Sequence, residues 1–248
     1  MHRFFAPSLD PGDETVVLPR DEAEHLTRVL RLAVGDSVSV FDGRGHEYLA
    51  RVAAAPRGSS GDVRLQVLSR IEPPPEPSVA LTLVQAVIKG DKMDDVVRDA
   101  VMMGVAAIQP MVTTRAETTV AALMRGRVER WRRIAISSVK QSHRAVLPEV
   151  RVPLTFENVL AEPAGAMRLM FVEPGAAGES EAVATLQSLP VPADAALFVG
   201  PEGGWTEQET SAARVAGVRL VTLGRRTLRA DAVAIAAVSV LQFLWGDL

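Results

Sequence analysis

Two short stretches near the C-terminal end combine glycines with charged side chains where a predicted strand ends. The first reads LFVGPEGGWTEQE over residues 197–209. Its apolar run stops at Gly200, and the segment from Thr206 to Glu209 has the spacing of a capping box, which predicts the start of a helix. A strand, a glycine-rich turn and a helix often bind a phosphate. The alternative is a tight crossover turn that binds no ligand.

The residues of this turn argue against a phosphate. The glycine spacing is G-x-x-G-G, which differs from the dinucleotide-binding and Walker patterns. Pro201 has no N–H to donate, and Glu202 places a negative charge where a phosphate needs donors. We therefore expect a ligand that is neutral or cationic at its near end.

The second stretch, LGRRTLRADAVA, covers residues 223–234 and also follows a predicted strand. Both loops then leave carboxyl ends of parallel strands, where such sheets bind ligands. Leu228 between two arginines favours an apolar contact. Arg229 and Asp231 flank the start of an apolar helix, whose dipole favours a carboxylate there. A capped helix with solvated arginines is the alternative, but two such loops together favour a site.

The third feature is a concentration of arginine in a helix predicted over roughly residues 120–144. The stretch RGRVERWRRIAISSVKQSHR contains a single acid, Glu129. In a chain with a formal net charge of -3, this predicts a local positive patch suited to RNA phosphates. Arg130 and Arg133 share a helix face, and Arg28 and Arg31 of the N-terminal helix would extend the patch. The alternative is a solvated helix face.

The composition excludes several classes of site. The chain has 248 residues, 48% hydrophobic and 23% charged, as in an ordinary globular protein. It contains no cysteine, which removes disulfides, thiolate zinc sites and thiol nucleophiles. Its histidines lack metal-ligand spacing, so no metal is expected. Neither a membrane-spanning run nor an apolar signal core is present, so we expect a cytoplasmic protein without membrane contact.

A proline-rich segment, IEPPPEPS at residues 71–78, predicts a linker between two domains. Before it, short strands, a hairpin turn at Gly43–Gly45 and a helix over residues 21–32 predict a small β-barrel. After it, strands and helices alternate, which predicts an α/β domain with a parallel sheet and helices on its faces. Its expected strands cover residues 79–87, 105–112, 167–173, 195–200 and 218–223, and its expected helices include residues 91–104 and 231–245. The predicted domains are residues 1–72 and 73–248.

Together these stretches resemble the RsmE family, the 16S ribosomal RNA (uracil-N3) methyltransferases of the SPOUT class. The resemblance spans nearly the whole chain. It rests on HLTRVLRLAVGD and FDG, on KGDKMDDVVRDAVMMGVAAIQP and RWRRIAISSVKQSHRAVLPEV, and on FVGPEGG and LGRRTLRADAVA through LQFLWGDL. The last two motifs are specific in combination.

The resemblance implies a PUA-like N-terminal barrel that binds RNA and a SPOUT domain with a trefoil knot. It further implies S-adenosylmethionine as cofactor, a homodimer, and 16S rRNA or the small ribosomal subunit as partner. The implied cofactor-binding residues are Glu173, Val199, Gly200, Gly203, Gly204, Val221, Leu223, Gly224 and Leu228. The expected RNA-binding residues are Arg28, Arg31, Arg130 and Arg133 of the positive patch, together with Gln141 and Arg144, which match the family pattern.

Uracil N3 is a neutral imide nitrogen, so its methylation needs a base or stabilisation of the anion on O2 and O4. We assign Arg229 to the developing negative charge. Asp231 is the candidate base or a positioning partner, with Glu202 as the alternative. The chain departs from the family pattern at Lys140, where a glutamate is usual, and at Asp231, which is one methylene shorter than the usual glutamate.

Two other classes of protein remain as alternatives. The first is a non-catalytic rRNA-binding or ribosome-assembly protein of the same fold, which would have no affinity for S-adenosylmethionine. The second is a dinucleotide-dependent oxidoreductase, which the absence of G-x-G-x-x-G after the first strand of the α/β domain disfavours.

Overall fold

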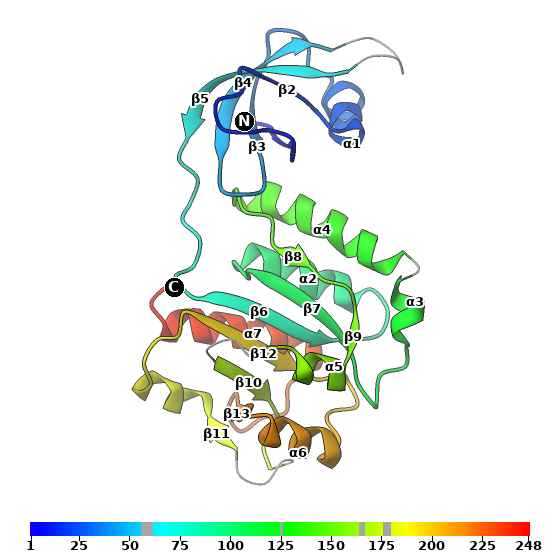
Figure 1. Cartoon of the computed structure of the whole chain (residues 1–248), viewed down its shortest axis with the longest axis vertical. Coiled ribbons are helices and arrows are strands. Elements are labelled where there is room, and N and C mark those ends of the chain that lie inside the picture. Colours follow the sequence, from blue (N-terminus) through cyan, green and yellow to red (C-terminus); the bar gives the residue numbers. More distant parts are fainter. Residues whose placement is uncertain (56–61, 125, 164–166, 176–179) are drawn as a thin grey trace. The chain divides into compact units, whose positions relative to one another are not determined.

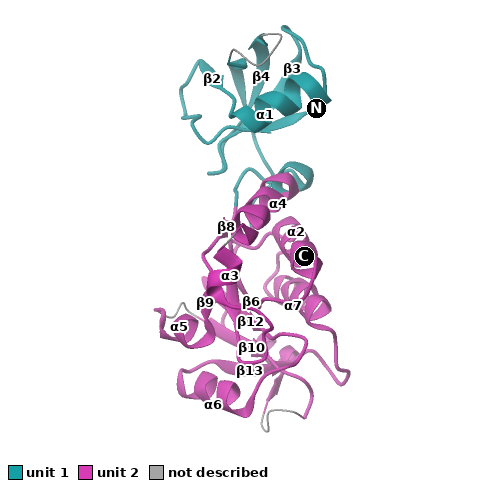
Figure 2. Cartoon of the chain, turned by 90° about the vertical axis from the view of Figure 1, so that its right-hand side faces the viewer, with its two compact units in different colours: residues 1–76, 139–147 teal, residues 77–138, 148–248 magenta. Residues whose placement is uncertain are grey.

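The computed structural model describes residues 1–248 except 56–61, 125, 164–166 and 176–179, and the chain forms two compact units. Unit 1 comprises Met1–Glu76 and Val139–Leu147, and unit 2 comprises Pro77–Ser138 and Pro148–Leu248 (Figure 2). The short segment 139–147 therefore groups with the N-terminal residues. The proposed domain boundary between residues 72 and 73 remains a prediction.

Unit 1 contains a five-stranded sheet and a helical segment over residues 20–29 (Figure 1). Its strands lie in the order β1 (Arg3–Phe5), β3 (Ser37–Phe41), β4 (Glu47–Ala54), β5 (Arg64–Ile71) and β2 (Thr15–Val17). β1 runs parallel to β3, and the other neighbours are antiparallel. The hairpin expected at Gly43–Gly45 is confirmed between β3 and β4. Closure of this sheet into a barrel remains a prediction.

The helix expected over residues 21–32 is only partly α-helical. It begins as α1 (Arg20–Glu24) and continues as a π-helical segment over His25–Val29. The N–H of Leu30 donates to the carbonyl of His25 at 3.0 Å, which is the i→i+5 bond of π-winding. The segment ends at Val29, and Arg31, two residues later, has a φ of 54° in the left-handed region.

Three ion pairs bind the segment 139–147 and β1 into unit 1. They are Arg3–Glu47 at 2.8 Å, Lys140–Glu22 at 2.8 Å, and Arg144–Glu76 with Nε 3.1 Å from both carboxylate oxygens. Arg3 also donates to the carbonyls of Val139 and Arg144. Buried charges are tolerated only when they are paired and hydrogen-bonded in this way. These pairs therefore account for the grouping of the segment with the N-terminal sheet.

Unit 2 contains a parallel sheet with helices on both faces. The strand order is β11 (Glu181–Ala182), β13 (Arg219–Thr222), β10 (Met167–Phe171), β12 (Asp194–Val199), β6 (Ala80–Ala86), β7 (Ala107–Val112) and β8 (Glu149–Val150), with β9 (Leu154–Thr155) also paired to β7. Every pairing in it is parallel across the described residues. Five expected strands correspond to β6, β7, β10, β12 and β13, so the α/β prediction is confirmed.

The helices of unit 2 cover the apolar faces of this sheet. They are α2 (Lys92–Met102), α3 (Val120–Met124), α4 (Arg127–Ser142), whose last residues count with unit 1, α5 (Phe156–Ala161), α6 (Glu207–Val215), α7 (Ala230–Leu244) and a 3-10 segment at Val183–Ser188. Figure 2 shows α2 and α7 on one side of the sheet and α5 and α6 on the other. The trefoil knot remains a prediction.

The prediction of a single helix over residues 120–144 was wrong. The chain forms two helices, α3 and α4, because Gly126 adopts a φ of 103°, which an α-helix cannot accommodate. Arg125, the first residue of the basic stretch, lies outside the described residues. Gly104, in contrast, follows the end of α2 with a φ of 93°, in the left-handed region that glycine often adopts just after a helix.

Candidate functional site

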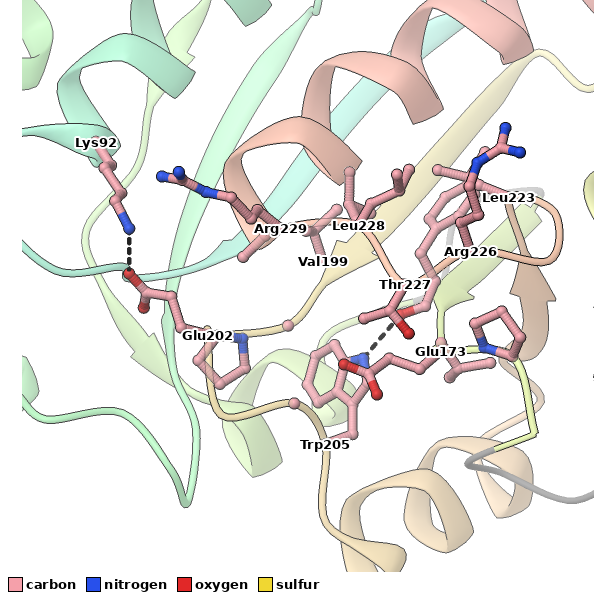
Figure 3. Close-up of a pocket in the computed structure, with 18 residues that line it drawn as sticks. Lys92, Glu173, Val199, Glu202, Trp205, Leu223, Arg226, Thr227, Leu228 and Arg229 are labelled. Atoms are coloured by element: carbon pink, nitrogen blue, oxygen red, sulfur yellow. Dashed lines mark hydrogen bonds and ion pairs between the residues drawn. The ribbon is translucent and has the colours of Figure 1, made fainter.

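A pocket of about 320 Å³ lies in unit 2 at the carboxyl ends of adjacent parallel strands (Figure 3). Its walls come from the loops that follow β10, β12 and β13, and Lys92 at the start of α2 completes it beside the loop after β6. These four strands are neighbours in the sheet. The expectation that the two glycine-containing loops leave carboxyl ends of parallel strands is therefore confirmed.

A capping box supports the turn after β12. Thr206 accepts the N–H of Glu209 at 3.1 Å, and the Glu209 carboxylate accepts the N–H of Thr206 at 2.8 Å. The same carboxylate accepts the N–H of Thr114 at 2.9 Å, although Glu209 is only 3% exposed. The predicted capping box is confirmed, and it also anchors the turn to the loop after β7.

Trp205 closes the turn from the other side. Its indole N–H donates to the carbonyl of Phe171, the last residue of β10, at 2.9 Å. The ring lies so close to Gly200 that a Cβ at that position would be 2.9 Å from it. Gly200 is thus required for close approach. This contact holds the ends of β10 and β12 together.

Arg115 fixes the rest of the turn. Its guanidinium donates to the carbonyl of Gly203 at 2.6 Å and to that of Trp205 at 3.3 Å. Gly204 adopts a φ of 68°, in the left-handed region that favours glycine. The turn is therefore held by hydrogen bonds that Arg115 donates to its carbonyls.

Most of the residues that the resemblance implied for the cofactor gather at this pocket. Those that line it are Glu173, Val199, Gly200, Gly204, Leu223 and Leu228. Gly203 belongs to the same turn but faces Arg115. Val221 is fully buried inside β13, and Gly224 is an exposed turn residue with a φ of 111°. The binding role of all nine residues remains a prediction.

Glu202 lies at one end of the pocket and already has cationic and N–H partners. Its Oε1 atom accepts the backbone N–H of Lys89 at 3.2 Å and lies 3.3 Å from Nζ of Lys92. These contacts tie the turn after β12 to the loop between β6 and α2. They favour the interpretation that Glu202 shapes the site.

Arg229 lines the pocket, and Asp231 lies beside it in the first turn of α7. Nε and Nη2 of Arg229 donate to the two oxygens of Asp231 at 3.2 Å and 3.3 Å, which is a bidentate arrangement. The Arg229 side chain is still 68% exposed. Asp231 therefore orients a guanidinium that remains accessible to a ligand.

Sequence reasoning missed several pocket residues as candidates for the site. They are Lys92, Phe171, Val172, Pro174, Pro201, Trp205, Arg226, Thr227, Ala230 and Val233. The rule about strand ends could have found Lys92, because the loop after β6 ends at the same edge of the sheet as the other loops. Arg226 and Thr227 lie inside the second chemical stretch and needed only to be included.

The predicted RNA-binding residues differ in how free their side chains are. Arg28, Arg31, Arg133 and Gln141 are exposed. Arg130 donates from Nε to Asp94 at 2.6 Å, so acids of α2 partly neutralise the basic face of α4. Arg144 is 6% exposed and pairs with Glu76, so an RNA contact through it would require an exchange of partners.

Within the described part of the chain, no group of three or more histidine, cysteine or acidic side chains is arranged to hold a metal ion. No helix among the described residues is long and apolar enough to cross a membrane.

Two family models match this chain. Residues 74–242 match the family model of an RNA methyltransferase domain, and residues 18–60 match that of an RNA methyltransferase PUA domain. The chain is 34% identical over 232 residues to the ribosomal RNA small subunit methyltransferase E of Synechocystis, covering 92% of this chain and 74% of the relative. It is 32% identical to the Mycobacterium bovis protein of the same name, covering 98% and 92% of the two chains.

Two solved structures are also similar to this chain over nearly its whole length. One is a ribosomal RNA small subunit methyltransferase E from Neisseria gonorrhoeae bound to S-adenosyl methionine, with a TM-score of 0.87, 32% identity and coverage of 100% and 99%. Another is a methyltransferase from Legionella pneumophila in complex with bound SAM, with a TM-score of 0.86, 28% identity and coverage of 97% and 96%.

The contact between Gly200 and Trp205 can be tested by a double-mutant cycle. Because the added Cβ would press on the indole, we expect Gly200→Ala to lower the free energy of unfolding by about 1–3 kcal/mol. The same change in a Trp205→Ala background should cost much less, since the ring is gone. Urea unfolding measures both values. An equal cost in the two backgrounds would contradict the proposed close contact.

Proposed function

This chain belongs to the family of ribosomal RNA small subunit methyltransferase E, and we propose that it transfers the methyl group of S-adenosylmethionine to N3 of a uridine in 16S rRNA. The observation that carries this proposal is the pocket at four strand ends, with Arg229 accessible at its wall. The substrate would be the rRNA or the small ribosomal subunit. Such a substrate would place the activity in the cytoplasm.

The residues of the pocket fit S-adenosylmethionine. The volume of about 320 Å³ lies within the usual range for small-molecule sites, roughly 300–1,000 Å³. Val199, Leu223 and Leu228 offer apolar surface for an aromatic base, and the carboxylate of Glu173 complements the positive charges of this cofactor. When bound, the cofactor supplies a methyl group on a positively charged sulfur.

The protein's own contribution is to favour the uracil anion and to orient the base. Arg229 presents a guanidinium whose donors can bind a uracil carbonyl oxygen as negative charge develops on it. Asp231 accepts hydrogen bonds from Nε and Nη2 of the same guanidinium, which supports its role as a positioning partner. Glu202, held by Lys89 and Lys92, is also assigned to shaping the site. The N3 proton then passes to water at the exposed end of the pocket.

We further propose that residues 1–72 are the RNA-binding domain and residues 73–248 the methyltransferase domain with its trefoil knot. The positions of the two family matches, residues 18–60 and 74–242, support this division. The exposed arginines of both regions, Arg28, Arg31 and Arg133, are the proposed phosphate contacts.

The protein is proposed to act as a homodimer through α7. This helix leaves apolar side chains exposed at Phe243 and partly exposed at Ile235 and Val240. Phe243 is 70% exposed, and Ala232, Ala236, Val240 and Phe243 have the spacing of one helix face. An apolar stripe of this kind is typical of an interface.

The catalytic assignment predicts that Arg229→Ala lowers kcat by about 10²–10³-fold, the usual cost of one oriented donor. Affinity for S-adenosylmethionine should change little, because Arg229 acts on the uracil. The measurement is methyl transfer to small ribosomal subunits from cells that lack the protein, with mass mapping of the rRNA and separate calorimetric titration of the cofactor.

If methyl transfer survives both Arg229→Ala and Asp231→Ala, the assignment is wrong. Binding of rRNA without affinity for S-adenosylmethionine would instead favour the non-catalytic alternative, and saturable binding of NADH would favour an oxidoreductase.

Arg133→Ala should weaken rRNA binding and reduce the slope of log affinity against log salt by about one, because one phosphate contact is lost. Arg130→Ala should do less, since Asp94 already engages that guanidinium. Arg98→Ala is the control, because Arg98 of α2 is paired with Asp95 and Asp99. Filter-binding titrations at several salt concentrations measure the slopes. An unchanged slope for Arg133→Ala would move the RNA surface elsewhere.

Phe243→Asp should convert the dimer to a monomer, because a carboxylate would be buried without a partner in the apolar interface. Val215→Asp is a matched control, since Val215 of α6 is 91% exposed and outside the proposed interface. Light scattering after size exclusion measures the mass. A monomeric wild-type protein, or a dimer that tolerates Phe243→Asp, would refute the α7 interface.

A further inference from the structure

Two cations, not one, lie at the Glu202 end of the pocket. Lys92 opens α2 immediately after the β6 loop, and Arg229 immediately precedes α7. Figure 3 shows the charged ends of Lys92 and Arg229 near Glu202, whereas Glu173, Thr227 and Trp205 lie at the other end. The function assigned above uses only Arg229.

Each cation is held by its own carboxylate. Nζ of Lys92 lies 3.3 Å from Glu202, and Arg229 makes its bidentate pair with Asp231. The two side chains remain 38% and 68% exposed, so both can still donate to a ligand. The four charges sum to zero, which lets two cations share one end of a pocket without strong repulsion.

The other charged groups around Lys92 do not replace it. Lys89, three residues earlier, turns its side chain to Glu117, with Nζ and Oε1 2.6 Å apart. The hydrogen bond and charge of Glu117 raise the pKa of Lys89. Glu173 and Arg226 also line the pocket, and Asp91 precedes Lys92 in the chain. Among the described residues that line the pocket, Lys92 is the only lysine.

The chemistry of uracil calls for two donors. Its N3 is flanked by two carbonyl oxygens, O2 and O4, and loss of the N3 proton spreads the negative charge over both. Donors that face O2 and O4 from either side would stabilise this anion and leave N3 itself open to the methyl group. Oriented donors act at the place where charge develops, so they are effective even in a cluster without net charge.

We propose that Lys92 is a second catalytic cation, which donates to one uracil carbonyl oxygen while Arg229 donates to the other. This inference rests on the proposed uracil-N3 methylation and adds a residue to it. The N3–H bond breaks and its proton passes to water. The N3 lone pair then forms the new bond to the methyl carbon while the bond between that carbon and the donor sulfur breaks, and the electron pair of this carbon–sulfur bond stays on the sulfur. Glu202 is the positioning residue for Lys92.

The test compares Lys92→Ala, Lys92→Arg and the matched control Lys89→Ala. Lys89→Ala removes the neighbouring lysine but keeps the backbone N–H that Glu202 accepts. We expect Lys92→Ala to lower kcat by about 10²-fold, Lys92→Arg to restore most of the rate, and Lys89→Ala to leave it unchanged. The dissociation constant for S-adenosylmethionine, measured by calorimetry, should stay the same in all three.

A substrate whose N3–H is more acidic separates a catalytic role of Lys92 from a structural one. Fluorine at C5 of uracil makes N3–H more acidic, so rRNA that contains 5-fluorouridine should recover at least about tenfold of the rate lost in Lys92→Ala, since ionisation then depends less on the second donor. The increase of kcat with rising pH should also occur at higher pH in Lys92→Ala than in the wild type. Without cofactor, ¹⁹F NMR of bound 5-fluorouridine rRNA should show N3 ionising at higher pH in Lys92→Ala than in wild type.

Several outcomes would overturn the inference. They are full activity of Lys92→Ala, an equal loss on uridine and 5-fluorouridine substrates, an unshifted ¹⁹F titration, or a loss of cofactor binding that matches the loss of rate. A wild-type protein that methylates no uridine would refute the proposed function itself, and the wild-type assay reveals that failure separately.

Discussion

The contact between Trp205 and Gly200 is the constraint on which the pocket depends. The indole ring occupies the space where any other residue at position 200 would place a Cβ, and its N–H binds the end of β10. This single side chain therefore sets the separation of the loops after β10 and β12. The loop after β7 adds two hydrogen bonds, because Arg115 donates to the carbonyl of Gly203 and the N–H of Thr114 donates to Glu209. The turn is therefore held by contacts from the ends of both β10 and β7. A rigid wall of this kind is what a small-molecule site requires, since orientation costs are then met during folding.

Many charged side chains of this protein form close ion pairs. At the pocket, Lys92 pairs with Glu202 and Arg229 with Asp231, and all four stay partly exposed. In unit 1, in contrast, Arg3, Glu47 and Arg144 are buried, and their pairs hold the chain together. Partly exposed pairs contribute little to stability, whereas breaking a buried pair is costly. The first kind is suited to exchange with a ligand, and the second to structure.

The departure from the family pattern at Lys140 has a local explanation. Nζ of Lys140 lies 2.8 Å from Glu22 and 5.4 Å from the centre of the Phe4 ring. The positive charge at this position is thus matched within unit 1 by an acid on α1. The nearby Arg144 is likewise engaged, by Glu76. Residues that a helical pattern grouped as an RNA-binding face are therefore divided between exposed arginines and structural ion pairs.

The five longest strands of unit 2, the capping box at Thr206 and the hairpin at Gly43–Gly45 could be predicted from the sequence, because they depend on residues close together in the chain. The two loops at the strand ends could also be predicted, since parallel strands place their carboxyl ends at one edge. The break at Gly126 was missed, because the helical pattern continues on both sides of it.

What only the tertiary structure decided is which charges meet. Lys92 and Glu202 are 110 residues apart, and Arg144 and Glu76 are 68 apart. No local pattern encodes such pairs, because their geometry follows from how β6, β12 and the segment 139–147 pack. By itself, the sequence determined the elements and the chemical character of the two loops. The packing of the strands determined that Lys92, Glu202, Arg229 and Trp205 line one pocket, since side chains distant in the chain meet only when the sheet brings their strand ends together.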